Sequence, residues 1–185
     1  CSANSDFYNV LSSFQSGNAD WSNLRQPVVG YYPGSYHSLM VDAVSDAFSI
    51  TSADMERSAI VKYHAATNQS GDSTFLLSGA NPFKAEEQVV VSDCSTATIF
   101  KIGKVTNDTT SYNSSGNCAI DGFVGLGASC NTVVPRNYTF SNGSMITGLR
   151  SRGYYVAPSV DDANRNSLYL IDFVRGTEPE EIAEN

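Results

Sequence analysis

Short runs of β-branched and aromatic residues punctuate the chain, and they constrain its fold more than any other feature. Between residues 47 and 105 each run is bounded by Gly, Asn, Asp or Pro, which end strands and form turns. The runs are AFSIT (47–51), AIVKYHA (59–65), TFLL (74–77), QVVVS (88–92) and TIFKIGKV (98–105). This spacing predicts a meander of antiparallel strands.

The segments around these runs are more polar. We expect residues 1–39 to form an irregular loop with one short helical turn around Phe7 to Phe14. Residues 106–130 predict a long, glycine-rich loop, and a loop of that length is often functional. Strands are expected to return at NTVVP, NYTF, SMITGL, RGYYVAP and SLYLIDFV. No strand–helix alternation indicates a parallel sheet, so we predict one β-rich domain over residues 1–185.

Composition excludes several partners. A chain of 185 residues with 41% hydrophobic residues can build a real core. Its 19 acidic and 11 basic side chains give a formal charge of −8, which repels nucleic acid and anionic membrane surfaces. We therefore expect no nucleic-acid partner. No apolar run approaches the roughly 18 to 20 residues that span a bilayer.

The four cysteines predict disulfides. Cys1, Cys94, Cys118 and Cys130 form an even set without a Cys-x-x-Cys pair, which argues against a structural zinc site. Three connectivities are open, and the short separation of Cys118 and Cys130 favours their pairing, which leaves Cys1 with Cys94. Oxidised pairs would place the protein outside the cytosol.

Cys94 stands at an unusual joint in VVVSDCSTATIFKIGKV (89–105), between two predicted strands. A reactive thiolate needs a neighbouring cation or helix N-terminus, and the local sequence offers Asp93 instead. We therefore interpret Cys94 as part of a disulfide. Asp93 is predicted to be a structural turn residue whose carboxylate accepts hydrogen bonds from backbone amides.

Motifs that would carry catalysis are weak. The Gly71 to Ser73 sequence GDS matches the nucleophile turn of lipase-like hydrolases, which also need a later histidine as general base. Both His37 and His64 precede the serine, so we interpret GDS as an ordinary turn. GFVGLGAS (122–129) lacks the order of a phosphate-binding loop. We assign no catalytic, cofactor-binding or metal residue, and expect neither a cofactor nor a small-molecule substrate.

The last ten residues, GTEPEEIAEN, are acidic. Thr177 as N-cap, Pro179 and early glutamates predict the start of a helix, or an edge segment. Calcium binding there is a weaker alternative, because the acids lack the spacing of a loop that wraps one ion.

Five Asn-x-Ser/Thr sequons, which are acceptor sites for N-glycosylation, help to distinguish the kind of host organism and give no information about catalysis. They begin at Asn68, Asn107, Asn113, Asn137 and Asn142.

Three segments, in this order, resemble the PilW-type minor pilins of bacterial type IV pili, whose relatives include the J-type minor pseudopilins of type II secretion. The first is CSANSDFYNVLSSFQSG, beginning at Cys1. In the second, PFKAEEQVVVSDCSTATIFKIGKV, an aliphatic strand ends in Asp93, Cys94 and Ser95, and the next strand carries Phe100. The third is RGYYVAPSVDDANRNSLYLIDFVRGTEPEEIAEN, with a Tyr-Tyr strand, a Ser-Leu-Tyr strand and an acidic segment.

The resemblance implies a pilin-like α+β fold, in which a mainly antiparallel β-sheet packs on a long N-terminal helix. That helix is expected to precede residue 1, and the chain is expected to continue beyond residue 185. The implied role is that of a non-enzymatic subunit that initiates type IV pilus assembly in the inner membrane, with a position at the fibre tip as a further expectation. Its partners would be other minor pilins, the major pilin and, through the helix, the inner membrane. Twitching motility and cell adhesion would depend on it, and it would occupy the periplasm and the extracellular pilus.

An alternative from another class stays open. The chain could be a secreted or surface ectodomain acting as an adhesin or binding module. The sequons favour a glycoprotein, and a cysteine at position 1 favours a lipoprotein acylated there. The coding sequence upstream of Cys1 separates these hypotheses, because a pilin needs a leader followed directly by an apolar helix.

Overall fold

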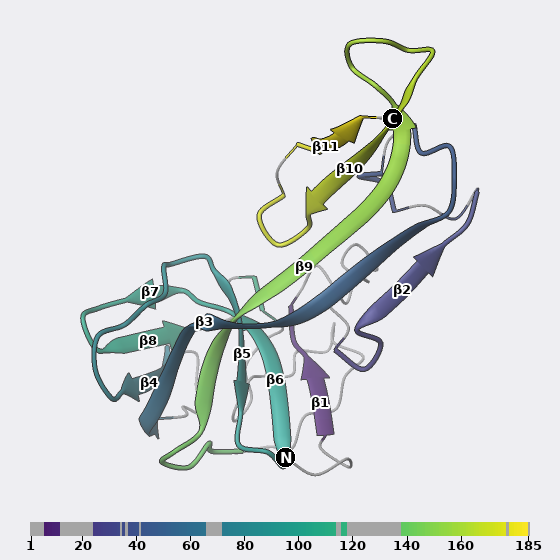
Figure 1. Ribbon diagram of the computed structural model, residues 1–185. Helices are drawn as coiled ribbons and strands as arrows, with labels where there is room; N and C mark the ends of the chain where they lie inside the picture. The colour runs from purple at the N-terminus through teal and green to yellow at the C-terminus, as the bar shows by residue number, and fades with distance from the viewer. Residues whose placement is uncertain are drawn as a thin grey trace. The chain divides into compact units, whose positions relative to one another are not determined.

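The computed structural model describes residues 6–11, 24–33, 35, 37–40, 42–65, 72–113, 116–117, 138–176 and 178–184. All regular structure within these residues is β-strand (Figure 1). The strands are β1 (Asp6–Asn9), β2 (Val28–Tyr31), β3 (Ala47–Ala65), β4 (Ser73–Leu77), β5 (Gln88–Ser92), β6 (Thr96–Lys101), β7 (Lys104–Val105), β8 (Thr109–Tyr112), β9 (Met145–Pro158), β10 (Asn166–Asp172) and β11 (Glu180–Glu184).

The predicted α+β fold is wrong for the described part of the chain, which contains no helix. The sheet is also mixed rather than purely antiparallel. β1 pairs parallel with β6, from Asp6 opposite Thr96 to Asn9 opposite Ile99. Nothing local in the polar DFYN sequence signals this pairing, because its partner strand lies far along the chain. Of the residues expected to form a helical turn, Phe7 to Asn9 lie in β1 instead, and residues 12–14 lie outside the described residues.

The strands follow the order β1-β6-β5-β9-β3-β4-β8-β7, with β2 beside β3 and β10 between β9 and β11. The chain divides into two compact units. Unit 1 comprises residues 1–22 and 53–149, and unit 2 comprises residues 23–52 and 150–185. Strands β3 and β9 each continue from one unit into the other.

The core of unit 1 is built from strands that are apolar on their inner faces. β5 and β6 are almost wholly buried. The ring centroid of Phe75 lies 5.7 Å from that of Phe100 and 5.5 Å from that of Tyr112. Phe75, Phe100 and Tyr112 are each fully buried, so these aromatic contacts stabilise the centre of the unit.

Unit 2 shows regular alternation along β9 and β10. Tyr155, Tyr169 and Ile171 point inward and are buried, while their neighbours in the sequence are half-buried or exposed. Gly153 also faces inward, where an added Cβ would lie 2.6 Å from Cε of Met40 and 2.7 Å from Cζ of Phe173. A larger residue at this position would therefore require these neighbouring side chains to shift.

Several predicted strands are confirmed, with changed boundaries. Residues 88–92 form β5 as expected, and residues 74–77 lie in β4. The runs at 47–51 and 59–65 belong to one 19-residue strand, β3, and SMITGL and RGYYVAP lie together in the 14-residue strand β9. The run at 98–105 is divided between β6 and β7.

Two loop or helix predictions are corrected. Thr109–Tyr112 forms β8, so residues 106–130 are not entirely loop; residues 118–130 lie outside the described residues, as does NTVVP. For the acidic tail, the helix start is wrong and the alternative of an edge segment is confirmed, because Glu180–Glu184 pairs antiparallel with β10.

Candidate functional site

The Asp93–Cys94 joint is a tight turn between β5 and β6. The Asp93 amide donates to the Thr96 carbonyl at 3.2 Å, which closes the turn. Oδ1 of Asp93 accepts hydrogen bonds from the amides of Ser95 (3.0 Å) and Thr96 (2.9 Å). Cys94 has a φ of +71°, in the left-handed region that costs energy for a residue other than glycine. The carboxylate of Asp93 therefore organises a strained backbone.

Tyr138 completes this turn. Its hydroxyl donates to Oδ2 of Asp93 and lies 2.9 Å from Oγ of Ser95. Burial alone would raise the pKa of Asp93, but hydrogen bonds from Tyr138, Thr96 and Ser95 outweigh it and lower the pKa below the ordinary value. Asp93 is thus held charged, which suits a turn-forming residue rather than a proton donor.

Cys94 is disulfide-bonded, and its partner falls outside the described residues. Cys1, Cys118 and Cys130 all lie outside them. The pairings Cys1 with Cys94 and Cys118 with Cys130 therefore stay predictions.

A histidine, a tyrosine and a serine form a hydrogen-bonded chain inside unit 1. Nε2 of His64 lies 2.9 Å from the hydroxyl of Tyr112, which is also hydrogen-bonded to Ser73. Nδ1 of His64 accepts the Phe140 amide at 3.1 Å, and the His64 ring stacks on Phe75 at 4.1 Å between centroids. Sequence reasoning did not connect these residues, because they come from three separate segments.

This chain is closed to solvent. Ser73 and Tyr112 are 0% exposed and His64 is 2% exposed. Burial lowers the pKa of His64 to about 4 and raises that of Tyr112. The serine of the GDS motif is thus linked to a histidine through Tyr112, and all three side chains are buried. The other histidine, His37, accepts the Leu39 amide at 3.2 Å.

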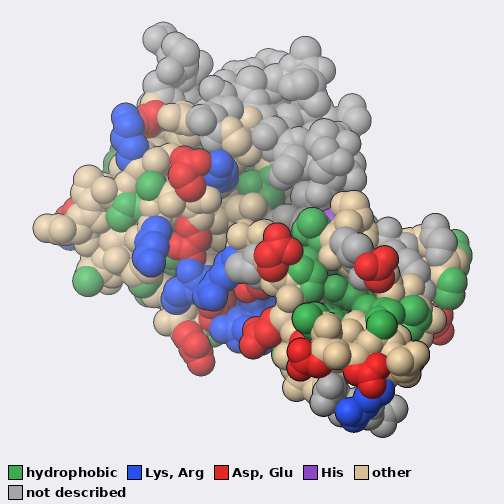
Figure 2. All heavy atoms as spheres, turned by 90° about the horizontal axis from the view of Figure 1, so that it is seen from above, with side chains coloured by type: hydrophobic (Ala, Val, Ile, Leu, Met, Phe, Trp, Pro, Cys, Tyr) green, Lys and Arg blue, Asp and Glu red, His purple; other side chains and the backbone are tan. Residues whose placement is uncertain are grey.

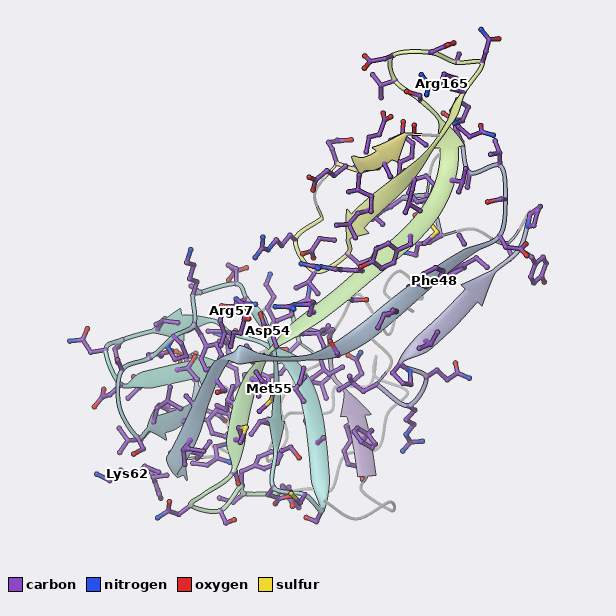
Figure 3. The ribbon with its side chains drawn as sticks, viewed as in Figure 1. Phe48, Asp54, Met55, Arg57, Lys62 and Arg165 are labelled. Atoms are coloured by element: carbon purple, nitrogen blue, oxygen red, sulfur yellow. The ribbon has the colours of Figure 1, made fainter. Side chains whose placement is uncertain are left out.

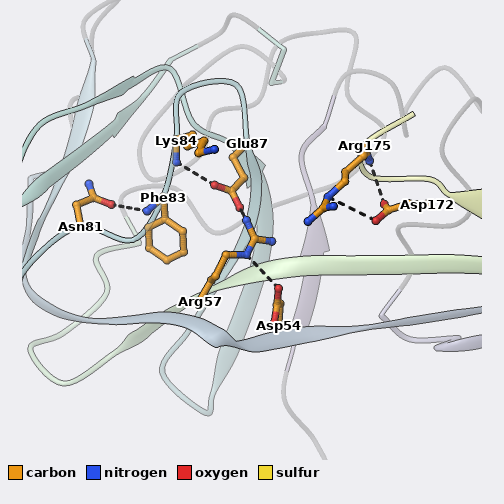
Figure 4. Close-up of polar contacts among 8 residues, drawn as sticks. All are labelled: Asp54, Arg57, Asn81, Phe83, Lys84, Glu87, Asp172 and Arg175. Atoms are coloured by element: carbon orange, nitrogen blue, oxygen red, sulfur yellow. Dashed lines mark hydrogen bonds and ion pairs between the residues drawn. The ribbon is translucent and has the colours of Figure 1, made fainter. Parts of the chain in front are cut away.

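An ion-pair network in unit 1 also escaped sequence reasoning. Arg57 donates through Nε to Oδ2 of Asp54 at 3.0 Å and through Nη1 to Oε1 of Glu87 (Figure 4). Oε2 of Glu87 accepts the Lys84 amide at 2.9 Å. An added Cβ at Gly148 would lie 2.8 Å from Nη2 of Arg57, so the glycine leaves room for the guanidinium. The network ties β3 to the segment before β5.

The sequon asparagines differ in exposure. Asn107 and Asn142 are exposed, whereas Asn113 donates to Oδ1 of Asp72 at 2.9 Å. Asn68 and Asn137 lie outside the described residues.

Within the described ranges no group of three or more His, Cys, Asp or Glu side chains could hold a metal ion. The same ranges contain no helix of the length and hydropathy needed to cross a bilayer.

Unit 2 carries an apolar sheet face whose side chains are exposed or half-buried, called here the outer face. Residues that stand opposite each other in paired strands lie on the same face of the sheet, so the register of the strands shows which residues belong to the outer face. The outer face consists of Val28, Phe48, Ile50, Tyr154, Val156, Leu168 and Leu170. Phe48 projects from β3 (Figure 3), and hydrophobic and acidic side chains lie side by side on the surface of unit 2 (Figure 2).

The described residues thus combine a buried polar chain with an apolar sheet face on a disulfide-linked β scaffold. The buried His64–Tyr112–Ser73 chain stabilises the core, and the outer face exposes apolar side chains. Comparison of the chain with protein-family models, with curated proteins and with solved structures finds no match.

Proposed function

We propose that this chain is the head of a minor pilin subunit that takes part, without enzymatic activity, in initiating type IV pilus assembly. One observation carries the proposal. The three pilin-like segments are far apart in the sequence, yet they supply neighbouring strands. β1 pairs with β6 and β6 with β5, which joins the first two segments. β5 pairs with residues 145–148 of β9, and the same strand continues into the third segment, where residues 152–158 pair with β10 and β10 pairs with β11. Motifs that share one sheet support a common role better than scattered motifs would.

Two further features support a subunit role. The Asp93–Cys94 turn is held by hydrogen bonds and by a disulfide, as expected for a domain that works outside the cytosol. The outer face exposes large apolar side chains, which mark protein-interaction surfaces in many proteins. The partners we propose are other minor pilins, the major pilin and the inner membrane, reached through a helix that precedes Cys1.

Deleting the gene from its host tests the proposal. We expect surface pili and twitching motility to be abolished or strongly reduced, and to be restored by a plasmid-borne copy. Normal pili in the deletion strain would overturn the initiating role. The coding sequence upstream of Cys1 gives an independent check, because a leader followed by an apolar helix of about 20 or more residues is expected. A lipobox ending at Cys1 would contradict the pilin assignment.

One observation favours a second candidate, a surface glycoprotein that acts as a binding module. The sequon residues Asn107 and Asn142 are both exposed, so both are accessible to a glycan. Mass spectrometry of the protein purified from its host separates the candidates. Hexose-containing mass additions at Asn107 and Asn142 would support the glycoprotein, and unmodified asparagines at both positions would exclude it.

A further inference from the structure

The outer face of unit 2 is continuous across four strands. Val28 in β2 stands opposite Ile50 in β3. The ring of Phe48 stacks on that of Tyr154 in β9, with centroids 5.1 Å apart, and Tyr154 stands opposite Leu170 in β10. The exposed fractions are 63% for Val28, 43% for Phe48 and 42% for Ile50, so water covers side chains that a partner could bury.

An acidic margin adjoins this apolar surface. Leu170 stands opposite Glu180 in β11, so the carboxylate lies at the end of the Phe48–Tyr154–Leu170 row. A cavity of about 230 Å³ opens there. It is lined by Arg152, Leu170, Asp172, Arg175, Glu178 and Glu180. The lining contains three carboxylates and two guanidinium groups, so its formal charge is −1.

The carboxylates of this margin differ in how they are engaged. Oδ1 of Asp172 accepts the amides of Val174 and Arg175, at 3.1 and 3.0 Å. Glu181 is held by Ser159, whose hydroxyl donates to it at 3.1 Å. The side-chain carboxylates of Glu178 and Glu180, by contrast, are exposed and make no hydrogen bond or ion pair with any described residue.

Arg152 also lines this cavity. Its Nε atom is buried and has no hydrogen-bond partner among the described residues, so the hydrogen-bonding capacity of the guanidinium group is incompletely used there.

We propose that the outer face docks a segment of a neighbouring pilus subunit in which apolar side chains are followed by a Lys or Arg. The apolar side chains cover Phe48 and Tyr154. The methylene stem of the basic residue lies on Leu170, and its charge lies between Glu178 and Glu180. The inference rests on the proposed function, and it names the surface through which the subunit contacts its neighbour. The net charge of −8 also favours a basic partner.

Site-specific photo-crosslinking in piliated host cells tests the proposal on the full-length protein. p-Benzoylphenylalanine replaces Phe48, and in separate strains it replaces Ile50 or, as a control in unit 1, the 58% exposed Met55. We expect the Phe48 and Ile50 probes, but not the Met55 probe, to link to a neighbouring pilus subunit. The linked peptide should contain apolar residues beside a Lys or Arg. Glu180→Lys should lower the yield about tenfold, whereas Asp108→Lys, the same charge change in unit 1, should not.

Each contrary result bears on the proposal. Links to a second copy of this chain, or to its own residues before Cys1, would overturn it, as would an unchanged yield in Glu180→Lys. Absence of links from both Phe48 and Ile50 in normally piliated cells would also overturn it, while leaving the proposed function in place if the deletion strain lacks pili. Normal pili in the deletion strain would instead remove the proposed function, and the docking inference with it.

Discussion

The hydroxyl group of Tyr112 lies 2.9 Å from Nε2 of His64, although 48 residues separate the two in the sequence. Nδ1 of His64 accepts a hydrogen bond from the Phe140 amide, so the neutral ring carries its proton on Nε2. The Nε2–H group therefore donates a hydrogen bond to the Tyr112 hydroxyl. Phe75 covers the ring. The core of unit 1 therefore contains a polar pair whose hydrogen bonds are satisfied within the protein.

Removing the hydroxyl of Tyr112 should destabilise the protein. Tyr112→Phe keeps the aromatic packing but leaves the Nε2 proton of His64 without this acceptor in a buried site. We expect the free energy of unfolding to fall by about 1 to 3 kcal/mol. Urea unfolding followed by circular dichroism measures the change.

Tyr63→Phe is the matched control for this measurement, because Tyr63 is 62% exposed on β3 in the same unit. The control should stay within about 0.5 kcal/mol of the wild type. Equal losses in the two variants would mean that the buried hydrogen bond adds nothing to stability.

Protonation of His64 should weaken the fold in mild acid. Burial lowers its pKa from 6.5 to about 4 in the folded protein. The unfolded chain therefore binds the proton more readily, and stability is lost as the pH falls from about 6.5 towards 4. Between pH 7 and pH 4.5 we expect a loss of about 2 kcal/mol from this residue.

Urea titrations of the wild type and of His64→Asn at several pH values isolate this contribution. The variant keeps a side-chain acceptor for the Phe140 amide but does not titrate, so its stability should change less over this range. Asp72 and Asp93 have lowered pKa values, so their contributions are lost at more acidic pH, below the ordinary value of 3.8. If the free energy of unfolding depended on pH in the same way in the wild type and the variant, His64 would not be the titrating group.

The local part of the fold was predictable from the sequence. Val89–Val91 and the turn at Asp93 follow from an apolar run that ends in a turn-forming residue. The middle of β3 was missed, because Ser52, Ala53 and Ser58 carry no strand alternation and are held in the strand by its continuation at both ends. The edge strand β11 was predicted only as one of two alternatives, because acids after Thr177 favour a helix N-terminus and the pairing with β10 leaves no local pattern in the sequence.

The non-local part was not predictable. The parallel pairing of β1 with β6 and the His64–Tyr112 contact join segments whose separation leaves no pattern in the sequence. The outer face was partly visible, because Leu168 and Leu170 alternate with buried residues. Its extension to Phe48 depends on the neighbouring strand, which only the sheet topology supplies.

Loss of Arg57 should be costly because it neutralises two carboxylates that are nearly buried. The side chains of Asp54 and Glu87 are 9% and 11% exposed, while that of Arg57 is 35% exposed. Arg57→Ala leaves both acids without this cation, and we expect a loss of about 2 kcal/mol, since partial exposure lets water moderate the penalty. Thermal and urea unfolding measure the effect.

Arg175→Ala serves as the control, because Arg175 is 72% exposed and its Nε lies 3.7 Å from Oδ2 of Asp172. Such a surface pair should contribute at most about 0.5 kcal/mol. If both variants lose the same free energy, the Arg57 network is no stronger than an exposed ion pair.

The disulfide pairings can be separated by a set of serine variants. Cys94 is disulfide-bonded, and the predicted partner is Cys1, with Cys118 paired to Cys130. Peptide mapping without reduction should find these two linkages. Cys1→Ser and Cys94→Ser should each lower the free energy of unfolding by about 2 to 4 kcal/mol.

Double variants test the disulfide pairing independently of peptide mapping. The double variant of Cys1 and Cys94 should be no less stable than either single variant, because both remove one bond. Cys118→Ser combined with Cys94→Ser should instead lose close to the sum of the two single losses. Additive losses for Cys1 and Cys94, or a mapped link from Cys94 to Cys118 or Cys130, would replace the predicted pairing with one of the other two connectivities.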